Sequence, residues 1–265
     1  MSAQVTFDKV AAAYDDFMGR WTRLYVPALV RAAALAPGQH VLDLATGTGE
    51  SALMAADAAG PASRIVAVDL SLPMLRGALA KLGARPIRLA AMDGQALACR
   101  DGAFHAVICQ LGLMFFPNPL AGLGEARRVL RPGGRFAALV WSRAERVPWF
   151  GVLAEQLAAH LPARRAEVFQ GVSLGDPERL RNLLAEAGFA DVTLTTETQS
   201  FLFESFDAYW AQVEAGAIRI GLMLRELSEA ERRAVRDAAA TRLAAFQSRG
   251  RLTLPTEALV ASGRK

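Results

Sequence analysis

The sequence predicts an α/β fold in which helices cover both faces of a doubly wound, mostly parallel sheet. Short apolar runs bounded by Gly or Pro alternate along the chain with longer helix-like stretches. A glycine-rich turn joins the first apolar run to the first of these stretches. Because parallel strands are buried on both faces, they read as continuous apolar runs of this kind. We therefore expect crossover helices between consecutive strands.

The first two strand–helix units follow directly from this alternation. Residues 40–45 and 64–69 are the first two apolar runs, and the helix-like stretches 50–59 and 72–82 come after them. The runs have the length of strands and the stretches have the length of helices. We expect two consecutive parallel strands here.

Three further strands are expected over residues 87–91, 106–111 and 135–141, with a helix over residues 119–130 before the last of them. Arg131-Pro132-Gly133-Gly134 separates that helix from the strand. Proline cannot continue a helix, and glycine adopts the positive φ that a helix C-terminus favours. This motif therefore predicts a tight turn from helix to strand.

The second half of the chain adds one helix and two strands to the sheet. Asp176 is the expected N-cap and Pro177 the first helical residue of a helix that closes at Gly188. A strand over residues 191–203 follows, and the last strand is expected over residues 257–262.

Two more helical stretches, residues 148–161 and 205–247, are not needed by the sheet and predict a lid. The second contains a capping box at Ser228 and Glu231. We expect the large apolar side chains of these stretches to form core rather than a substrate pocket. They are Phe206, Tyr209, Trp210, Ile218, Ile220, Leu222 and Met223.

Composition excludes several classes of protein. The 265 residues are 52% hydrophobic, enough for one core with an appendage. Lys plus Arg 30 against Asp plus Glu 26 leaves +4 without a run of like charges, so we expect no nucleic-acid surface. Cys99 and Cys109 have neither disulfide-framework nor metal-site spacing. With no signal peptide and no apolar run near 18 residues, we expect a cytoplasmic protein without a membrane span.

The glycine-rich turn predicts a nucleotide-like cofactor. It reads Asp43-Leu44-Ala45-Thr46-Gly47-Thr48-Gly49-Glu50, and its glycines let the main chain approach a ligand closely. Twenty residues after Gly49, Asp69 ends the second strand, where a carboxylate can accept hydrogen bonds from ribose hydroxyls. Gly47 to Ala52 also satisfies the dinucleotide motif G-x-G-x-x-G/A, so the turn alone leaves a nicotinamide-dependent oxidoreductase open.

Residues 38–142 resemble the class I S-adenosylmethionine-dependent methyltransferases. Asp43-x-Ala45-x-Gly47-x-Gly49 is similar to their motif I with Ala at the first Gly, and Asp93-Gly94-Gln95 and Pro132-Gly133-Gly134 fit the surrounding pattern. The chain is most similar to the ubiquinone/menaquinone-biosynthesis C-methyltransferase group and its small-molecule relatives, which share the N-terminal helix read here at residues 7–15. The resemblance implies a seven-stranded Rossmann-like sheet with N-terminal helices and a helical lid insertion. It also implies S-adenosylmethionine as cofactor.

With that architecture the chain divides into six segments. They are N-terminal cap helices (1–35), a cofactor-binding core (36–146), a lid helix (147–175), a core helix and strand (176–204), a helical lid insertion (205–250) and a last core strand (251–265).

Carried over to this sequence, the resemblance implies contacts for the methionine and ribose parts of the cofactor. Ala45, Gly47 and Thr48 line the methionine part, and Asp69 holds the ribose. Gly49 of the same turn is a further cofactor-binding residue. An alternative is open for Asp43 at the start of this motif, because its carboxylate can instead tie down its own loop through backbone amides.

The resemblance also implies contacts for the adenine. Met74 covers the ring, or forms core; Asp93 meets the amino group, and Gly94 and Gln95 supply adjacent contacts. Gln110, at the end of the fourth strand, touches the methionyl part.

Two aromatic residues resemble the residues that cap the cofactor. They are Tyr14 and Trp21, and Trp21 can alternatively pin its helix to the sheet. His105 stands where the family usually has Asp, and we interpret it as a strand-end residue.

The expected chemistry needs few protein groups. A sulfonium methyl is already activated, so the protein has only to align the acceptor and exclude water, without a metal. A general base is needed only for an acidic acceptor, and the candidates are His160 and Tyr209, each with a structural role as the favoured alternative. The apolar loop 112–118 favours a small hydrophobic acceptor. No catalytic residue and no oligomeric state is assigned, and an S-adenosylmethionine-binding protein without transfer activity is a further alternative.

Overall fold

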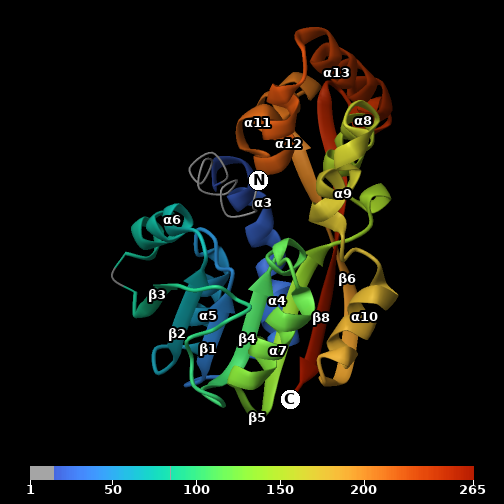
Figure 1. Ribbon diagram of the computed structural model, residues 1–265. Coiled ribbons are helices and arrows are strands. Elements are labelled where there is room, and N and C mark those ends of the chain that lie inside the picture. The colour runs from blue at the N-terminus through green and yellow to red at the C-terminus, as the bar shows by residue number, and fades with distance from the viewer. Residues whose placement is uncertain (1–14, 84) are drawn as a thin grey trace.

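The computed structural model describes residues 15–83 and 85–265, and Figure 1 shows one mixed sheet flanked by helices. The strands in the main path of the sheet have the order β3-β2-β1-β4-β5-β8-β6. They are β1 (His40–Leu44), β2 (Arg64–Asp69), β3 (Ile87–Ala91), β4 (Phe104–Gln110), β5 (Leu130–Trp141), β6 (Ala190–Phe203) and β8 (Arg251–Arg264). A two-residue strand, β7 (Gln247–Ser248), pairs with β8 beside this path, so the described sheet has eight strands where seven were expected.

The helices of the described residues are η1 (Asp15–Gly19), α3 (Arg20–Thr22), η2 (Arg23–Tyr25), α4 (Val26–Ala33), α5 (Glu50–Ala59), α6 (Leu72–Leu82), η3 (Leu113–Phe115), α7 (Pro119–Val129), η4 (Ala144–Arg146), α8 (Pro148–His160), η5 (Pro162–Arg164), α9 (Arg165–Val168), η6 (Phe169–Val172), α10 (Pro177–Glu186), α11 (Phe206–Gly216), α12 (Ile218–Glu226), α13 (Glu229–Leu243) and η7 (Ala244–Phe246).

The direction of the crossovers places the functional edge of the sheet. Strands β1 to β5 are parallel to one another, and β8 is antiparallel to both of its neighbours in the main path, β5 and β6. From β1 the chain moves outward through α5 to β2 and through α6 to β3, whereas β4 leads through α7 to β5 in the opposite direction. Right-handed crossovers therefore put α7 on the opposite face from α5 and α6. The order reverses between β1 and β4, and such a switch point leaves a crevice at the carboxyl ends of the strands.

The bounds of several short elements agree closely with those predicted from the sequence. Helices α5 and α6 and strands β2 and β3 have the expected bounds. Gly188 adopts a positive φ of 84° just after the end of α10, as expected where a helix ends. Gly133 also has a positive φ, 74°, but α7 ends at Val129 and β5 begins at Leu130, so the predicted turn motif at residues 131–134 lies within β5 and not between helix and strand. Asp176 caps α10 by accepting a hydrogen bond from the amide of Arg179.

The last strand is longer than expected: β8 begins at Arg251, whereas the prediction began at residue 257. Its first half alternates buried Leu252, Leu254 and Thr256 with exposed residues. This two-residue period marks a strand with one solvated face, and a search for continuous apolar runs misses it. Both β6 and β8 extend beyond the rest of the sheet and reach the lid helices (Figure 1).

The predicted helical lid stretch 205–247 contains three α-helices, α11 to α13. Its capping box at Ser228 and Glu231 is present. Tyr209 is fully buried, and its hydroxyl donates a hydrogen bond to the carbonyl oxygen of Trp149 on α8 at 2.6 Å. The lid is thus a packed helical layer, as its apolar composition predicted.

Residues 15–25, the cap segment hereafter, cross from the helical layer to the sheet. Trp21 stacks on Phe201 of β6 with ring centroids 4.8 Å apart. At the end of the segment, the buried hydroxyl of Tyr25 donates to the carbonyl oxygen of Thr256 at 2.7 Å. The cap segment is therefore anchored on the strands that carry the lid.

Candidate cofactor and active site

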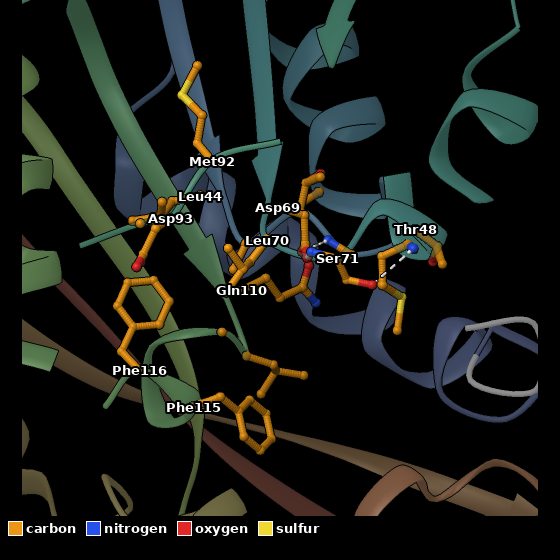
Figure 2. A pocket seen from close by; sticks show the side chains of 18 of the residues that line it. Leu44, Thr48, Asp69, Leu70, Ser71, Met92, Asp93, Gln110, Phe115 and Phe116 are labelled. Atoms are coloured by element: carbon orange, nitrogen blue, oxygen red, sulfur yellow. Dashed lines mark hydrogen bonds between the residues drawn. The ribbon is translucent and has the colours of Figure 1, made fainter. Parts of the chain in front are cut away.

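The candidate site is a cavity at the carboxyl ends of β1, β2 and β4, where the strand order reverses (Figure 2). Nine of the residues predicted from the sequence line it. They are Ala45, Gly47, Thr48, Asp69, Met74, Asp93, Gly94, Gln95 and Gln110. Residues that are distant in sequence thus converge because parallel strands all end at this edge.

The glycine-rich turn forms one wall of the cavity in a left-handed backbone conformation. Ala45, Gly47 and Gly49 have φ of 57°, 55° and 89°. The space that a side chain on Gly47 would occupy is open. A Cβ on Gly49 would instead lie 3.2 Å from the Cβ of Ala78, so this glycine permits close packing of α5 against α6. Gly49 was expected to bind the cofactor, but it does not line the cavity, and it supports the turn through this packing instead.

Asp43 lies beneath the turn, fully buried. Its Oδ2 accepts hydrogen bonds from the hydroxyls of Thr46, at 2.5 Å, and Ser51, at 2.7 Å. Burial raises the pKa of this carboxyl to about 7, against the lowering effect of the hydroxyl hydrogen bonds. The geometry matches the interpretation in which Asp43 ties down its own loop.

Asp69 connects the two loops that border the cavity. Its Oδ2 accepts a hydrogen bond from the amide of Gly47 at 2.8 Å, and its Oδ1 accepts one from the amide of Ser71 at 2.9 Å. Figure 2 shows the carboxylate beside Ser71, at the end of β2. One carboxylate thus holds the glycine-rich turn against the start of α6 and lines the cavity.

Another carboxylate organises the loop after β3. Asp93 Oδ1 accepts hydrogen bonds from the amide of Gln95 at 2.9 Å and from its side-chain Nε2 at 3.2 Å. Gln95 Oε1 accepts one from the amide of Asn118 at 2.8 Å, so the Gln95 side chain joins the loops after β3 and β4. The ring of Phe116 lies beside Asp93 (Figure 2). A Cβ on Gly94 would come within 2.5 Å of this phenylalanine ring. Gly94 therefore leaves the room that Phe116 fills.

Gln110 connects the cavity to the cap segment. Its Nε2 donates a hydrogen bond to the carbonyl oxygen of Thr22 at 2.6 Å, and both residues line the cavity. The cap segment is thus part of the cavity wall.

Several predicted residues lie elsewhere. Tyr14 lies outside the described residues. Trp21 is not among the residues that line the cavity, and its stacking on Phe201 matches the alternative in which it pins its helix. Neither His160 nor Tyr209 lines the cavity, and burial raises the pKa of Tyr209 well above its usual value. The geometry therefore favours structural roles for both base candidates.

The cavity also contains residues that the sequence reasoning did not assign to the cofactor. They are Thr22, Leu44, Thr46, Glu50, Ser51, Leu70, Ser71, Met92, Leu111, Gly112, Phe115, Phe116 and Pro117. For Ser71 a signal existed, because a serine before Leu-Pro is a helix N-cap, and its hydroxyl does accept from the amide of Met74. Phe116 belongs to the apolar loop 112–118, which the sequence connected with the acceptor and not with the cofactor. For Leu70 the only signal was its position directly after β2.

Among the described residues, no group of three or more His, Cys, Asp or Glu side chains is arranged to hold a metal ion. No helix in the same part of the chain combines the length and apolarity needed to cross a membrane.

Comparison with known proteins identifies the family. The family described as "Methyltransferase domain" matches residues 41–134. The demethylmenaquinone methyltransferase of Renibacterium salmoninarum is 34% identical over 206 residues, 71% of this chain and 83% of that protein. The ubiquinone/menaquinone biosynthesis C-methyltransferase UbiE of Cupriavidus metallidurans is 33% identical over 178 residues, 60% of this chain and 72% of that protein.

The fold is also found in a solved structure. A solved structure of Haemonchus contortus phosphoethanolamine N-methyltransferase 2 in complex with S-adenosyl-L-methionine has a TM-score of 0.64 at 16% identity, over 100% of this chain and 60% of that one. This likeness shows a shared fold. The chain belongs to the class I S-adenosylmethionine-dependent methyltransferases, in the group of the ubiquinone/menaquinone-biosynthesis and demethylmenaquinone methyltransferases.

Proposed function

We propose that the cavity binds S-adenosylmethionine and that the chain transfers its methyl group to carbon of a small, apolar, quinone-type acceptor by in-line displacement without a metal ion. The observation that carries this proposal is the convergence on one cavity of the glycine-rich turn, the Asp69 carboxylate and the apolar loop after β4. The names of the relatives support the acceptor class, since they are demethylmenaquinone and ubiquinone/menaquinone methyltransferases.

The residues present fit this cofactor. Asp69 offers carboxylate oxygens to a pair of ribose hydroxyls at the end of β2. Met74, Leu70 and Phe116 supply apolar surface for a flat base, with the Asp93 carboxylate next to the Phe116 ring. Gly47 presents bare main chain with open space beside it, which suits the amino-acid part of the ligand.

The protein's own contribution is alignment and exclusion of water. When bound, S-adenosylmethionine supplies an electrophilic methyl on a sulfonium, and holding an acceptor in line with it can be worth ~7–11 kcal/mol. Gln110 holds the cap segment on the cavity through Thr22, which limits access of solvent. Leu111 and Phe115 add apolar lining next to Gln110, where an uncharged ring can pack.

A binding experiment followed by a transfer experiment tests the proposal. Calorimetry with S-adenosylhomocysteine should show stoichiometric binding, and NAD under the same conditions should show none. Radiolabelled methyl from S-adenosylmethionine should then appear on carbon of a demethylated naphthoquinol, but not on phenols or fatty acids. Binding of NAD alone contradicts the cofactor, and binding without transfer to any acceptor contradicts the proposed activity.

A further inference from the structure

A group of four polar side chains joins the cap segment to the glycine-rich turn. Asp15 Oδ1, at the start of η1, accepts hydrogen bonds from Lys81 Nζ at 2.6 Å and from the hydroxyl of Thr48 at 2.7 Å. Lys81 Nζ, on α6, also donates to Glu50 Oε1 at 2.7 Å and to Thr48 Oγ1 at 3.3 Å. We call this group, Asp15, Thr48, Glu50 and Lys81, the latch.

The latch involves the cavity directly. Thr48 and Glu50 both line the cavity, whereas Asp15 and Lys81 reach them from outside its lining. Thr48 is also in contact with α6, since a Cβ on Gly77 would lie 3.3 Å from its methyl group. Movement of the cap segment away from the turn therefore has to break hydrogen bonds made by a residue of the cavity wall.

The second observation is the space reserved for Asp15. A Cβ on Gly19 would come within 2.6 Å of Asp15 Oδ1 and 3.2 Å of its carboxyl carbon. Gly19 has φ of −55°, a conformation open to any residue, so its backbone conformation does not require glycine. The missing side chain instead lets the carboxylate lie against the cap segment and face Lys81.

The electrostatics favour a contact that can open. The side chains of Lys81, Glu50 and Asp15 are 23%, 23% and 36% exposed, so water screens their attraction only in part. Lys81 faces two carboxylates, and its removal leaves Asp15 and Glu50 as like charges on either side of the cap–turn contact. At its other end the cap segment is held by Tyr25 and Thr22, independently of the latch.

We propose that Lys81 is a positioning residue that closes the cap segment on the glycine-rich turn, and that release of the cofactor product requires this latch to open. The proposal rests on the proposed function only in its second part. The first part concerns contacts within the chain and is tested without ligand.

Two variants disturb the latch by different means. Lys81→Met removes the charge at similar length, and Gly19→Ala displaces the Asp15 carboxylate without changing any charge. Lys81→Arg keeps the charge and should restore part of the contact. Arg85→Met is the matched control, because it removes a cation from the exposed ion pair with Asp57, which is away from the cavity.

The decisive readout is hydrogen exchange of residues 15–25 in the ligand-free protein. Lys81→Met and Gly19→Ala should both lose protection there while β1 and β5 keep theirs, and Arg85→Met should match the parent. Unchanged protection of residues 15–25 in both latch variants overturns the proposal, as does an equal loss of protection across β1 and β5, since that indicates general destabilisation.

The dissociation rate of S-adenosylhomocysteine, measured by stopped flow, tests the second part. It should rise roughly three- to tenfold in Lys81→Met, with less salt dependence than in the parent. A parent-like rate overturns that part. If the parent does not bind S-adenosylhomocysteine, the proposed function fails, and the ligand-free exchange experiment still decides the latch.

Discussion

The Asp69 carboxylate has two roles, one in the cavity lining and one in holding two loops together, and two substitutions separate them in part. Its carboxylate lines the cavity and also accepts from the amides of Gly47 and Ser71. We expect Asp69→Ala to weaken S-adenosylhomocysteine binding by about 1.5–3 kcal/mol for each charged hydrogen bond lost, because no acceptor remains for the ribose. Asp69→Asn, which keeps one oxygen acceptor, should lose less.

Calorimetry on both variants provides the measurement, with Asp57→Ala on the exposed face of α5 as control. Thermal unfolding checks that the fold survives. Parent-like affinity in Asp69→Ala would show that the residue is purely structural.

Asp43 makes stability depend on pH. Its pKa is raised from an ordinary value of 3.8 to about 7, because the ionised form is buried. The folded state therefore binds the proton more tightly than the unfolded state does. Its contribution to stability is fully present below pH 3.8 and is lost as the pH rises through about 7.

Asp43→Asn removes this titration, so the parent's stability minus that of the variant should fall as the pH rises from 5 to 8. Urea unfolding of the two proteins at matched pH values gives this difference, in which other titrating groups cancel. A difference that does not change with pH contradicts the assignment.

For individual residues, the sequence predicted which side chains lie at the cavity better than it predicted their hydrogen-bond and packing partners. Spacing and resemblance predicted that Asp69, Asp93 and Gln110 belong to one site. All three line the cavity, because strand ends in a parallel sheet share one edge. The hydrogen bond from Gln110 to the carbonyl oxygen of Thr22 could not be predicted, since it depends on how the cap segment packs. Trp21 does not line the cavity for the same reason. Its ring stacks on Phe201, which lies 180 positions later in the chain.

Among the elements, the turn after β1 and the loop after β4 are fitted to each other. Ala45, with φ of 57°, occupies a conformation that glycine adopts without cost, and a Cβ on Gly112 would overlap its methyl group. The same Cβ would lie 3.2 Å from Cys109 Sγ. The alanine that departs from the family motif thus has its space provided by a glycine that packs directly against it from the loop after β4.

We expect Gly112→Ala to destabilise the fold by about 1–3 kcal/mol through overpacking. Adding Ala45→Gly should recover most of that loss, because it removes the opposing methyl group and relieves the positive φ. Urea unfolding of the two single variants and the double variant measures the coupling. A double variant no more stable than Gly112→Ala would contradict the proposed contact.

The sequence predicted helix ends well where their signals were strong and incompletely where those signals were weak. Helix α6 has a serine N-cap at Ser71, and α5 lies between Gly49 and Gly60; the bounds of both helices agree with the sequence. The stretch 205–247 lacks an internal proline. Its capping box at Ser228 marks the start of α13 after the break near Leu227, but nothing strong marks the break near Ala217 that separates α11 from α12. These breaks let the lid helices pack on α8, which is a tertiary effect.

For the whole molecule, the proposed chemistry predicts that turnover does not depend on a metal ion. Alignment of an already activated methyl group requires no Lewis acid. We expect methyl transfer by the purified protein to be unchanged after dialysis against EDTA. Loss of turnover in the chelator, restored by adding back one divalent ion, would overturn the metal-free part of the proposal.

The strand order has a consequence for the path of folding. Within the main path of the sheet β6 neighbours only β8, and the second half of β8 pairs with β5 on one side and β6 on the other. On the ribosome β6 and the lid helices emerge before β8 does, so β6 waits through more than forty residues for the partner that joins it to the sheet. The parallel half from β1 to β5 can assemble during this interval, whereas insertion of β8 closes contacts of long sequence separation and is intrinsically slow. The lid helices therefore pack in their final place late, after the glycine-rich turn has formed. A nascent chain that is interrupted before β8 leaves β6 as an unpaired strand that can aggregate.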